Sequence, residues 1–454
     1  MKANRSLVLS CVRIIAFCFI FCQFFTMSGD HWRYFTQDVH PTARSGLYFA
    51  IPMASTGEAY ILDFTTFYAA GLLNKQRIEK NLSIDIYDPF LFTQAIERVA
   101  APIKAQGTFC LQYPPIFFAL VTPLAYFNAY TAWRIWIFAS ALFLTIAYLF
   151  TAYDLLKNRP LLLCGLFITL TNFPAADLLC LGQMSGIELA FIALSFRLLI
   201  DKKYFSAGLV AAGALLKLHQ SLIILLPGFC TGKKDFLRGF LLMTVMQFLL
   251  SVPVVGYYNI TNFIRTNYMS EIAHTYGDMN DVWWYQTFRG MLKCLPWFIS
   301  SADAIGWATY LLVIAFAVIL WLKVFPLLQK KSGCAIQLLG SVSMIALIVF
   351  SPHGYWYDQI LYMLPCLWLY IWSTTDEFKY TLAQSIIRLI ISITVLYVPL
   401  FQWENVLRRV VFDTTIMWDQ IRLFSMGLVL LGCAITAVVL EFKTQREPIV
   451  SLIE

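Results

Sequence analysis

The chain has 454 residues, of which 59% are hydrophobic and 13% are charged, and its net charge is +7. This composition excludes an ordinary soluble globular protein and indicates that the chain is solvated by a lipid bilayer. Most of the Lys and Arg residues lie in short loops, so the positive charge indicates membrane topology rather than nucleic-acid binding. We therefore expect an all-α polytopic membrane protein.

Apolar runs along the chain predict about twelve transmembrane helices, since a helix needs about 20 mostly apolar residues to cross the hydrocarbon core. The first run follows Lys2 and Arg5; it is too long for a signal peptide and is interpreted as a membrane anchor. Two consecutive short runs fit a tilted or re-entrant hairpin as well as two spans. The predicted spans are 7–27, 132–153, 161–176, 184–200, 205–218, 219–231, 238–257, 302–323, 334–350, 357–373, 384–401 and 421–440.

Short basic loops predict the orientation, because such loops stay in the cytoplasm. All of them fall on one side of the twelve-span arrangement, which places both termini in the cytoplasm. The apolar run at 113–127 would reverse every later loop if it crossed, so we expect a re-entrant or surface-lying helix there. The basic residues are Lys157 with Arg159, Lys202 with Lys203, Lys233 with Lys234 and Arg238, Lys330 with Lys331, Lys379, and Lys443 with Arg446.

One long non-cytoplasmic loop, 28–131, follows the first span, and two shorter outer loops are predicted at 258–301 and 402–420. From Asp63 the segment DFTTFYAAGLLNKQ places apolar residues at helical spacing, which predicts an amphipathic helix at the membrane surface. Asp63 itself has two interpretations. It is a good helix cap, and it could also act as a general base that takes a proton from an acceptor hydroxyl.

Ionisable residues at the outer ends of later spans form a second group of candidates. Lys217 and His219 lie at the turn between the two short runs, where they could bind a lipid phosphate or simply extend to the interface. His353 and Asp358 belong to SPHGYWYDQ, in which Pro and Gly break a helix at the same boundary. Such breaks are tolerated where they line a cavity.

The polar candidates for contact with a sugar or acceptor are Tyr113, Gln183, Gln286 and Asp358. Gln183 could hydrogen-bond a sugar hydroxyl or cap a neighbouring helix. The 5 histidines show neither HxxxH nor HExxH spacing, and the chain contains no P-loop and no GxGxxG turn. We therefore expect no metal and no cofactor.

The order of these motifs resembles the GT-C superfamily of membrane glycosyltransferases, and most closely glycosyltransferase family 87, the polyprenyl-phosphate-mannose-dependent α-mannosyltransferase-like proteins. The resemblance covers about the first 365 residues. It implies a catalytic membrane module at 1–373, with 374–454 as C-terminal transmembrane helices of unknown role. The matching segments are DF with FYAAG from Asp63, IYDP at 86–89, YPPIFFALVTPLA at 113–125, LGQMSG at 181–186, AGLVAAGALLKLHQ at 207–220 and SPHGYWYDQILYMLP at 351–365.

The resemblance implies transfer of a hexose, usually mannose, from a polyprenyl-phosphate carrier to a hydroxyl of a lipid or glycan acceptor. Asp63 matches the catalytic base of the first outer loop. Lys217, His219 and His353 match basic residues that hold the donor phosphate. The resemblance also implies a multi-pass protein of the bacterial inner membrane whose active site faces the periplasm.

Two other functions fit the same pattern. A transporter or flippase of lipid-linked sugars would also have many spans with broken helices, but the halves of this chain differ and its polar residues gather at one face. A lipid-linked glycan polymerase or ligase would share the donor and the outer site. Such enzymes usually place key arginines in a large late outer loop, whereas Arg408 and Arg409 lie in a small one.

Overall fold

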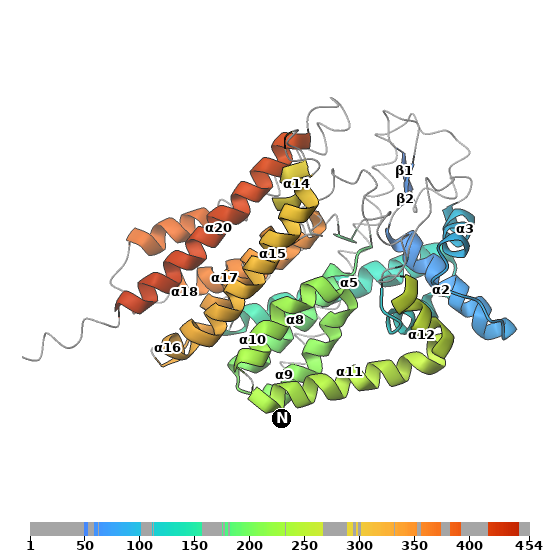
Figure 1. Ribbon diagram of the computed structural model, residues 1–454, viewed down its shortest axis with the longest axis horizontal. Coiled ribbons are helices and arrows are strands. Elements are labelled where there is room, and N and C mark those ends of the chain that lie inside the picture. Colours follow the sequence, from blue (N-terminus) through green and yellow to red (C-terminus); the bar gives the residue numbers. More distant parts are fainter. Residues whose placement is uncertain are drawn as a thin grey trace, which may run out of the picture. The chain divides into compact units, whose positions relative to one another are not determined.

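A computed structural model shows a helical chain that divides into two compact units (Figure 1). Unit 1 comprises 1–145, 178–186 and 245–279, and unit 2 comprises 146–177, 187–244 and 280–454. The structure describes residues 50–52, 59–61, 63–100, 111, 113–156, 175, 178–179, 182–231, 233–266, 288–293, 297, 301–330, 332–351, 356–373, 382–391 and 416–444.

Unit 1 opens with a short antiparallel ribbon, in which Ala50 pairs with Ile61, and the ribbon precedes the helix predicted from Asp63. The ribbon is the exception to the all-α expectation among the described elements. The first half of the helix buries its aromatic residues, whereas its last turn is exposed. The described elements with residues in unit 1 are β1 (Ala50–Pro52), β2 (Ala59–Ile61), α2 (Asp63–Lys80), α3 (Pro89–Ala100), α4 (Phe117–Val121), η2 (Pro123–Tyr126), α5 (Ala129–Leu156) and α12 (Tyr257–Ile264), together with the start of α8 (Ser185–Ile200) and the end of α11 (Lys233–Val255).

The apolar run at 113–127 forms two short helices, α4 and η2, with Thr122 between them and Pro123 as the first residue of η2. Together they extend from Phe117 to Tyr126, about 15 Å at 1.5 Å per residue, which is half of the roughly 30 Å hydrocarbon core. Their length is too small for a transmembrane helix. A re-entrant or surface position remains a prediction.

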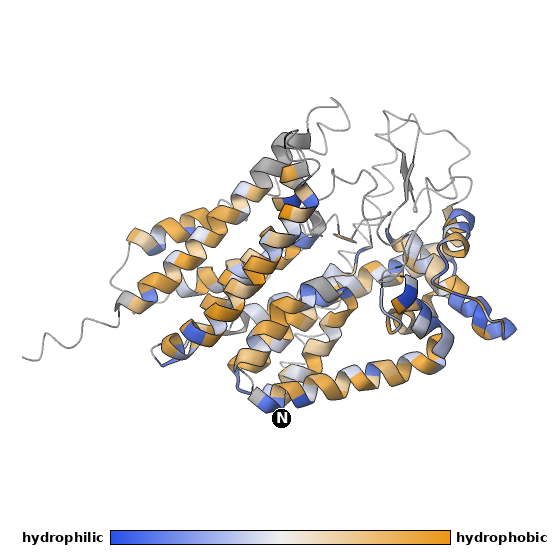
Figure 2. Cartoon of the chain, in the orientation of Figure 1, coloured by the Kyte–Doolittle hydropathy of each residue, from blue (hydrophilic) through white to orange (hydrophobic). Residues whose placement is uncertain are grey.

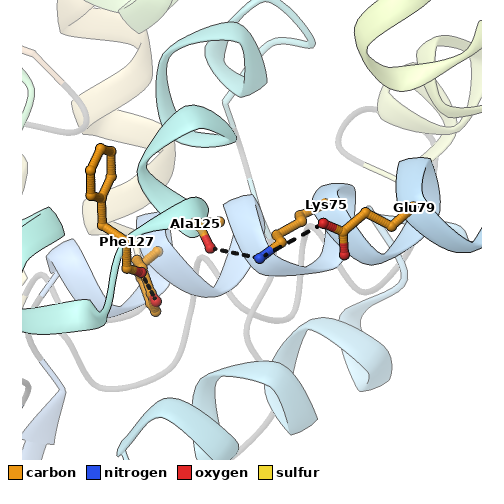
Figure 3. A network of polar contacts seen from close by, with 5 residues as sticks. Lys75, Glu79, Ala125 and Phe127 are labelled. Carbon is orange, nitrogen blue, oxygen red and sulfur yellow. Dashed lines mark hydrogen bonds and ion pairs between the residues drawn. The ribbon is translucent and has the colours of Figure 1, made fainter.

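Polar contacts hold the end of η2 against α2. The Tyr68 hydroxyl donates to the Phe127 carbonyl at 2.7 Å, and Lys75 Nζ donates to the Ala125 carbonyl at 3.3 Å. Figure 3 shows Lys75 between that carbonyl and the carboxylate of Glu79, which lies 3.9 Å away. These bonds satisfy carbonyls that the short 3-10 helix leaves without helical partners. The broken apolar segment is therefore anchored to α2.

The IYDP segment is held by α12 and starts α3. Asn259 Oδ1 accepts a hydrogen bond from the Ile86 N–H at 2.9 Å, and Asn262 Nδ2 donates to Asp85 Oδ2 at 2.7 Å. Asp88 Oδ1 accepts from the N–H groups of residues 90 and 91 at 2.8 and 2.9 Å. Asp88 is thus the N-cap of α3 and Pro89 its first residue, a favourable combination. The segment therefore has a clear structural role.

Asp85 provides a test of the electrostatics of this region. Burial raises the pKa of its carboxyl group, and this effect outweighs the hydrogen bonds from the Tyr87 N–H and from Asn262, which favour the charged form. When folding raises the pKa of a carboxyl group, its protonated form favours the folded state. This contribution is complete at pH values below the pKa of the unfolded chain and is lost as the pH rises through the pKa of the folded protein. Asp85→Asn should therefore raise the thermal unfolding temperature in detergent at pH 7 and have no such benefit near pH 4.

Asp88→Asn is a companion variant, because Asn is as good a helix cap as Asp and the charge of Asp88 also raises the pKa of Asp85. We expect its unfolding temperature to lie between those of the wild type and Asp85→Asn at pH 7 and to match that of the wild type near pH 4. A lower unfolding temperature for Asp85→Asn at pH 7 would contradict the interpretation, because the ionised carboxylate would then be net stabilising.

Unit 2 consists of apolar helices, and α17, α18 and α20 lie alongside one another within it (Figure 1). Near its end, α15 continues through a π-helical turn, η6, into α16, which has a proline near its start. The division between the units falls inside α5, α8 and α11. The further elements with residues in unit 2 are α8 (Ser185–Ile200), α9 (Tyr204–Ala211), η3 (Ala212–Lys217), α10 (Leu218–Thr231), α11 (Lys233–Val255), α14 (Phe288–Lys293), α15 (Ala302–Ile319), η6 (Leu320–Val324), α16 (Phe325–Gln329), α17 (Ala335–Val349), η7 (Trp356–Tyr362), α18 (Met363–Ser373) and α20 (Ile416–Thr444).

Four helices in the described part of the chain are long and apolar enough to cross a membrane. In the window on α11, 17% of the residues are buried, and the side chains that it exposes are largely apolar (Figure 2). Such a surface is expected where lipid is the solvent. The four correspond to predicted spans at 132–153, 238–257, 302–323 and 421–440, and they are Thr131–Thr151, Lys234–Val255, Ala302–Gln329 and Phe424–Phe442.

The other predicted spans correspond to shorter helices or are not described. Residues 184–200 and 334–350 form α8 and α17, with 16 and 15 residues. The span at 7–27 and most of 161–176 lie outside the described residues, as does most of the outer loop at 402–420. The total of twelve crossings therefore stays a prediction.

The two short runs at 205–231 fold back on each other. Gly208 of α9 and Gly228 of α10 both lie against Phe236 of α11, because a Cβ at either glycine would come within 2.1 Å of that residue. The turn between the two arms falls at Lys217, where η3 ends and α10 begins. The first arm is about 24 Å long and the second about 21 Å, at 1.5 Å per α-helical and 2.0 Å per 3-10 residue, and a tilted or re-entrant position stays a prediction.

Candidate functional site

Asp63 is the first residue of α2 and is half-buried. The Thr66 hydroxyl donates to the Asp63 backbone carbonyl at 2.6 Å and closes the first helical turn. A carboxylate at this end of a helix interacts favourably with the helix dipole. The position therefore suits the stabilising role that the sequence predicts, and it leaves the role of a general base compatible with it.

The start of α2 lies against the turn of the LGQMSG segment. Gly182 has a φ of 72°, and a Cβ at this position would come 2.6 Å from the Cβ of Phe64. Trp136 Nε1 donates to the Gly182 carbonyl at 2.6 Å, which fixes the turn against α5. Gln183 is buried, and its Oε1 has no hydrogen-bond partner among the described residues. The segments that carry Asp63 and Gln183 are thus in direct contact within unit 1.

Tyr113 belongs to the aromatic cluster beside this turn. Its ring stacks on Phe117 at 4.5 Å between centroids and meets Phe67 of α2 edge-on at 5.1 Å. Phe67 in turn packs against Trp136 at 5.7 Å. The Tyr113 backbone carbonyl accepts a hydrogen bond from the Tyr87 hydroxyl at 3.1 Å. Tyr113, Asp63 and Gln183, which were predicted separately, therefore come from segments that pack together.

Gly182→Ala tests whether this contact positions the start of α2. The substitution adds a methyl group against Phe64 at a left-handed backbone position, so we expect a loss of stability of roughly 1–3 kcal/mol together with reduced enzyme activity. Gly333→Ala is the control, because a Cβ there meets nothing within 4 Å. Thermal unfolding in detergent measures the stability of both variants. An unchanged unfolding temperature for Gly182→Ala would show that the turn is not tightly packed.

A buried ion pair joins two other predicted residues within unit 2. Lys217 Nζ donates to Asp358 Oδ1 at 2.9 Å, and the side chains are 8% and 2% exposed. Lys217 lies at the turn of the 204–231 hairpin, and Asp358 lies in η7. Removing either partner of a buried ion pair is destabilising, because it leaves the other charge uncompensated.

Glu188, which was not among the residues predicted from the sequence, lies in the first turn of α8 and is 1% exposed. It interacts electrostatically with Lys217 and Asp358, and neither of its carboxyl oxygens has a hydrogen-bond partner among the described residues. An ionisable residue inside the predicted span at 184–200 was the available signal. We call Glu188, Lys217 and Asp358 the Lys217 cluster.

Three predicted site residues are not described by the structure. His353 and Gln286 lie outside the described residues, as does the side chain of His219 within α10. Arg289, from the same outer loop as Gln286, is buried and donates from Nε to Asp303. In the part of the chain that the structure describes, no group of three His, Cys, Asp or Glu side chains could hold a metal ion.

The described chain contains four apolar helices long enough to cross a membrane, and these indicate a membrane protein. The family model for glycosyltransferase family 87 matches residues 111–352, more than half of the chain, and the chain belongs to this family. The protein is therefore a glycosyltransferase, which takes a sugar donor and an acceptor, as the sequence predicts. The match includes Gln183 and Lys217, whereas Asp63 and Asp358 lie outside it. Searches of curated proteins and of solved structures returned no match.

Proposed function

We propose that the protein transfers a hexose, mannose in the first instance, from a polyprenyl-phosphate carrier to a hydroxyl group of a lipid or glycan acceptor. The reaction takes place at the periplasmic face of a bacterial inner membrane. The observation that carries the proposal is the position of Asp63, which is half-buried at the start of α2 beside the Gly182 turn. Family membership adds the sugar-transfer chemistry.

Asp63 is the general base in this proposal. Its carboxylate takes the proton of the acceptor hydroxyl as the acceptor oxygen attacks the anomeric carbon of the sugar. The bond between that carbon and the phosphate oxygen breaks, and polyprenyl phosphate leaves with the bonding electrons. A positioned carboxylate contributes a rate factor of about 10²–10⁴ to such a step. Gln183, Tyr113 and Gln286 are the proposed contacts to the sugar and the acceptor.

Lys217 stabilises the leaving phosphate in this proposal, and His219 and His353 assist it. Negative charge develops on the phosphate as the bond breaks, and a fixed cation in a site of low dielectric constant lowers the energy of that transition state. Asp358 holds the Lys217 ammonium in place through their 2.9 Å bond. The ion pair favours this positioning role for Asp358 over direct contact with the sugar.

A panel of donors tests the proposal. Membranes that contain the wild-type protein are supplied with labelled polyprenyl-phosphate mannose, polyprenyl-phosphate glucose or a nucleotide-activated mannose, and labelled lipid and glycan products are separated. We expect transfer from the polyprenyl-phosphate sugars, with mannose preferred, and none from the nucleotide sugar. Transfer from the nucleotide sugar alone would overturn the proposed donor class. Labelled donor that crosses the membrane without product would indicate a carrier instead.

A further inference from the structure

Unit 2 contains a second polar site, a small pocket at the far end of the helices that carry the Lys217 cluster. Its lining includes Thr151 of α5, Arg197 of α8, Gln337 of α17, and Trp368 and Trp372 of α18. Arg197 lies in the last turn of α8, whereas Glu188 lies in its first turn, so about 14 Å of helix separates the pocket from the cluster. The free volume is about 40 Å³, and one water needs roughly 10–15 Å³ by this measure.

The lining of this pocket selects a particular kind of ligand. Gln337 Oε1 is buried and has no hydrogen-bond partner among the described residues, so it requires a donor such as a hydroxyl group. Arg197, which pairs with Asp201 at 3.0 Å, provides a guanidinium group of the kind that binds phosphate. Trp372 is held in place because its Nε1 donates to Glu441 at 3.0 Å. A compact anion that carries hydroxyl groups fits these features.

The surroundings of the pocket favour an anionic ligand at a membrane boundary. Lys202 and Lys203 follow α8, and Lys330 precedes α17; all three are exposed. These lysines belong to the short loops that the sequence assigns to the cytoplasmic side, where anionic lipids attract basic segments. Phe150, which also lines the pocket, is 36% exposed and offers apolar surface beside it.

We infer that this pocket binds a hydroxylated phosphate ester, and specifically the headgroup of an anionic lipid of the phosphatidylglycerol type. The phosphate lies at Arg197, and a headgroup hydroxyl donates to Gln337 Oε1. Only the hydroxyl end of the headgroup enters the free volume, whereas the phosphate stays at its edge beside Arg197 and the acyl chains lie outside against Phe150. The site is separate from the proposed sugar-transfer chemistry and does not depend on it.

The test uses the full-length protein in detergent, titrated with three soluble probes. These are dihexanoyl phosphatidylglycerol, dihexanoyl phosphatidylcholine and glycerol 1-phosphate, and binding is measured by calorimetry. We expect phosphatidylglycerol to bind more tightly than phosphatidylcholine. Arg197→Gln should weaken its binding about ten- to hundredfold, because a charge-assisted hydrogen bond is lost, and Gln337→Leu should weaken it about two- to tenfold.

Two substitutions at exposed sites serve as matched controls. Arg238→Gln removes an arginine that also pairs with a nearby aspartate, but whose side chain is 71% exposed, and Gln329→Leu removes an exposed glutamine near α17. Both should leave the binding unchanged. Unfolding temperatures without ligand show whether each variant is folded. If Arg197→Gln does not fold, Gln337→Leu alone carries the test.

The results distinguish three cases, which are a lipid ligand, a soluble phosphate ester and no specific ligand. Tight binding of phosphatidylglycerol with weak binding of glycerol 1-phosphate supports a lipid. Equal binding of both, lost in Arg197→Gln, supports the pocket but identifies a soluble phosphate ester as its ligand. Absence of saturable binding, or equal weakening by the pocket and control variants, would overturn the inference. Sugar transfer is measured in a separate assay, so the results of the binding experiment do not affect the interpretation of the donor panel.

Discussion

Asp63→Asn is expected to lower the rate of sugar transfer by about 10²–10⁴-fold while the thermal stability stays nearly unchanged. The asparagine side chain has nearly the same shape and loses only the interaction of the charge with the helix dipole, worth about 0.3–1 kcal/mol, so α2 should begin at the same residue. It cannot take a proton from the acceptor hydroxyl at neutral pH. The substitution therefore separates the structural role of Asp63 from the proposed catalytic role.

The measurement for Asp63→Asn is the transfer rate from saturating polyprenyl-phosphate mannose as a function of pH. We expect kcat to fall while the KM for the donor changes little, because the base acts in the transition state rather than in donor binding. The wild-type rate should decline in acid as Asp63 is protonated, and the variant should lack this decline. Asp88→Asn, which replaces the carboxylate that caps α3, is the control and should retain full activity.

Transfer by Asp63→Asn within tenfold of the wild-type rate would remove Asp63 as the base. The helix-terminal role would then be sufficient to explain the residue. Asp63→Ala completes the series, because it removes both functions. Its loss of stability, expected to be about 1 kcal/mol, measures the structural contribution alone.

The amphipathic helix and the longest spans could be predicted because their signals are local. Asp63 followed by apolar residues at helical spacing predicts the start of α2, and that helix begins at the expected residue. The run at 302–323 is long and apolar and lies within a continuous helical segment that ends at Gln329. Periodicity and hydropathy determine such elements because the bilayer requires every backbone group to be bonded within the segment.

The contacts of the candidate site could not be predicted, because they join residues far apart in the chain. Lys217 and Asp358 are 141 residues apart, and topology alone assigned both to the same boundary. Their ion pair depends on how the 204–231 hairpin meets η7, which no local pattern records. Asp88 is the opposite case, because its role depends on local hydrogen bonds. Its place in the IYDP segment matched a family motif, yet its hydrogen bonds show that it caps α3.

Asp358→Asn is expected to destabilise the protein by roughly 3–5 kcal/mol and to abolish transfer, because the Lys217 ammonium would lose the carboxylate that compensates its buried charge. Thermal unfolding in detergent measures the stability. Asp235→Asn is the matched control, since its ion pair with Arg238 is exposed on both sides. Breaking an exposed pair should change the stability by about 0–1 kcal/mol.

Replacement of the whole Lys217 cluster by uncharged residues distinguishes a structural ion pair from a phosphate site. The triple variant Lys217→Met, Asp358→Leu and Glu188→Gln leaves no uncompensated buried charge, so its stability should return to that of the wild type or exceed it. Transfer should stay lost, because the cation proposed to stabilise the leaving phosphate is gone. Recovery of both stability and transfer would contradict the proposed role of Lys217, since the cluster would then serve packing alone. The proposed role of Lys217 therefore predicts that stability recovers and transfer does not.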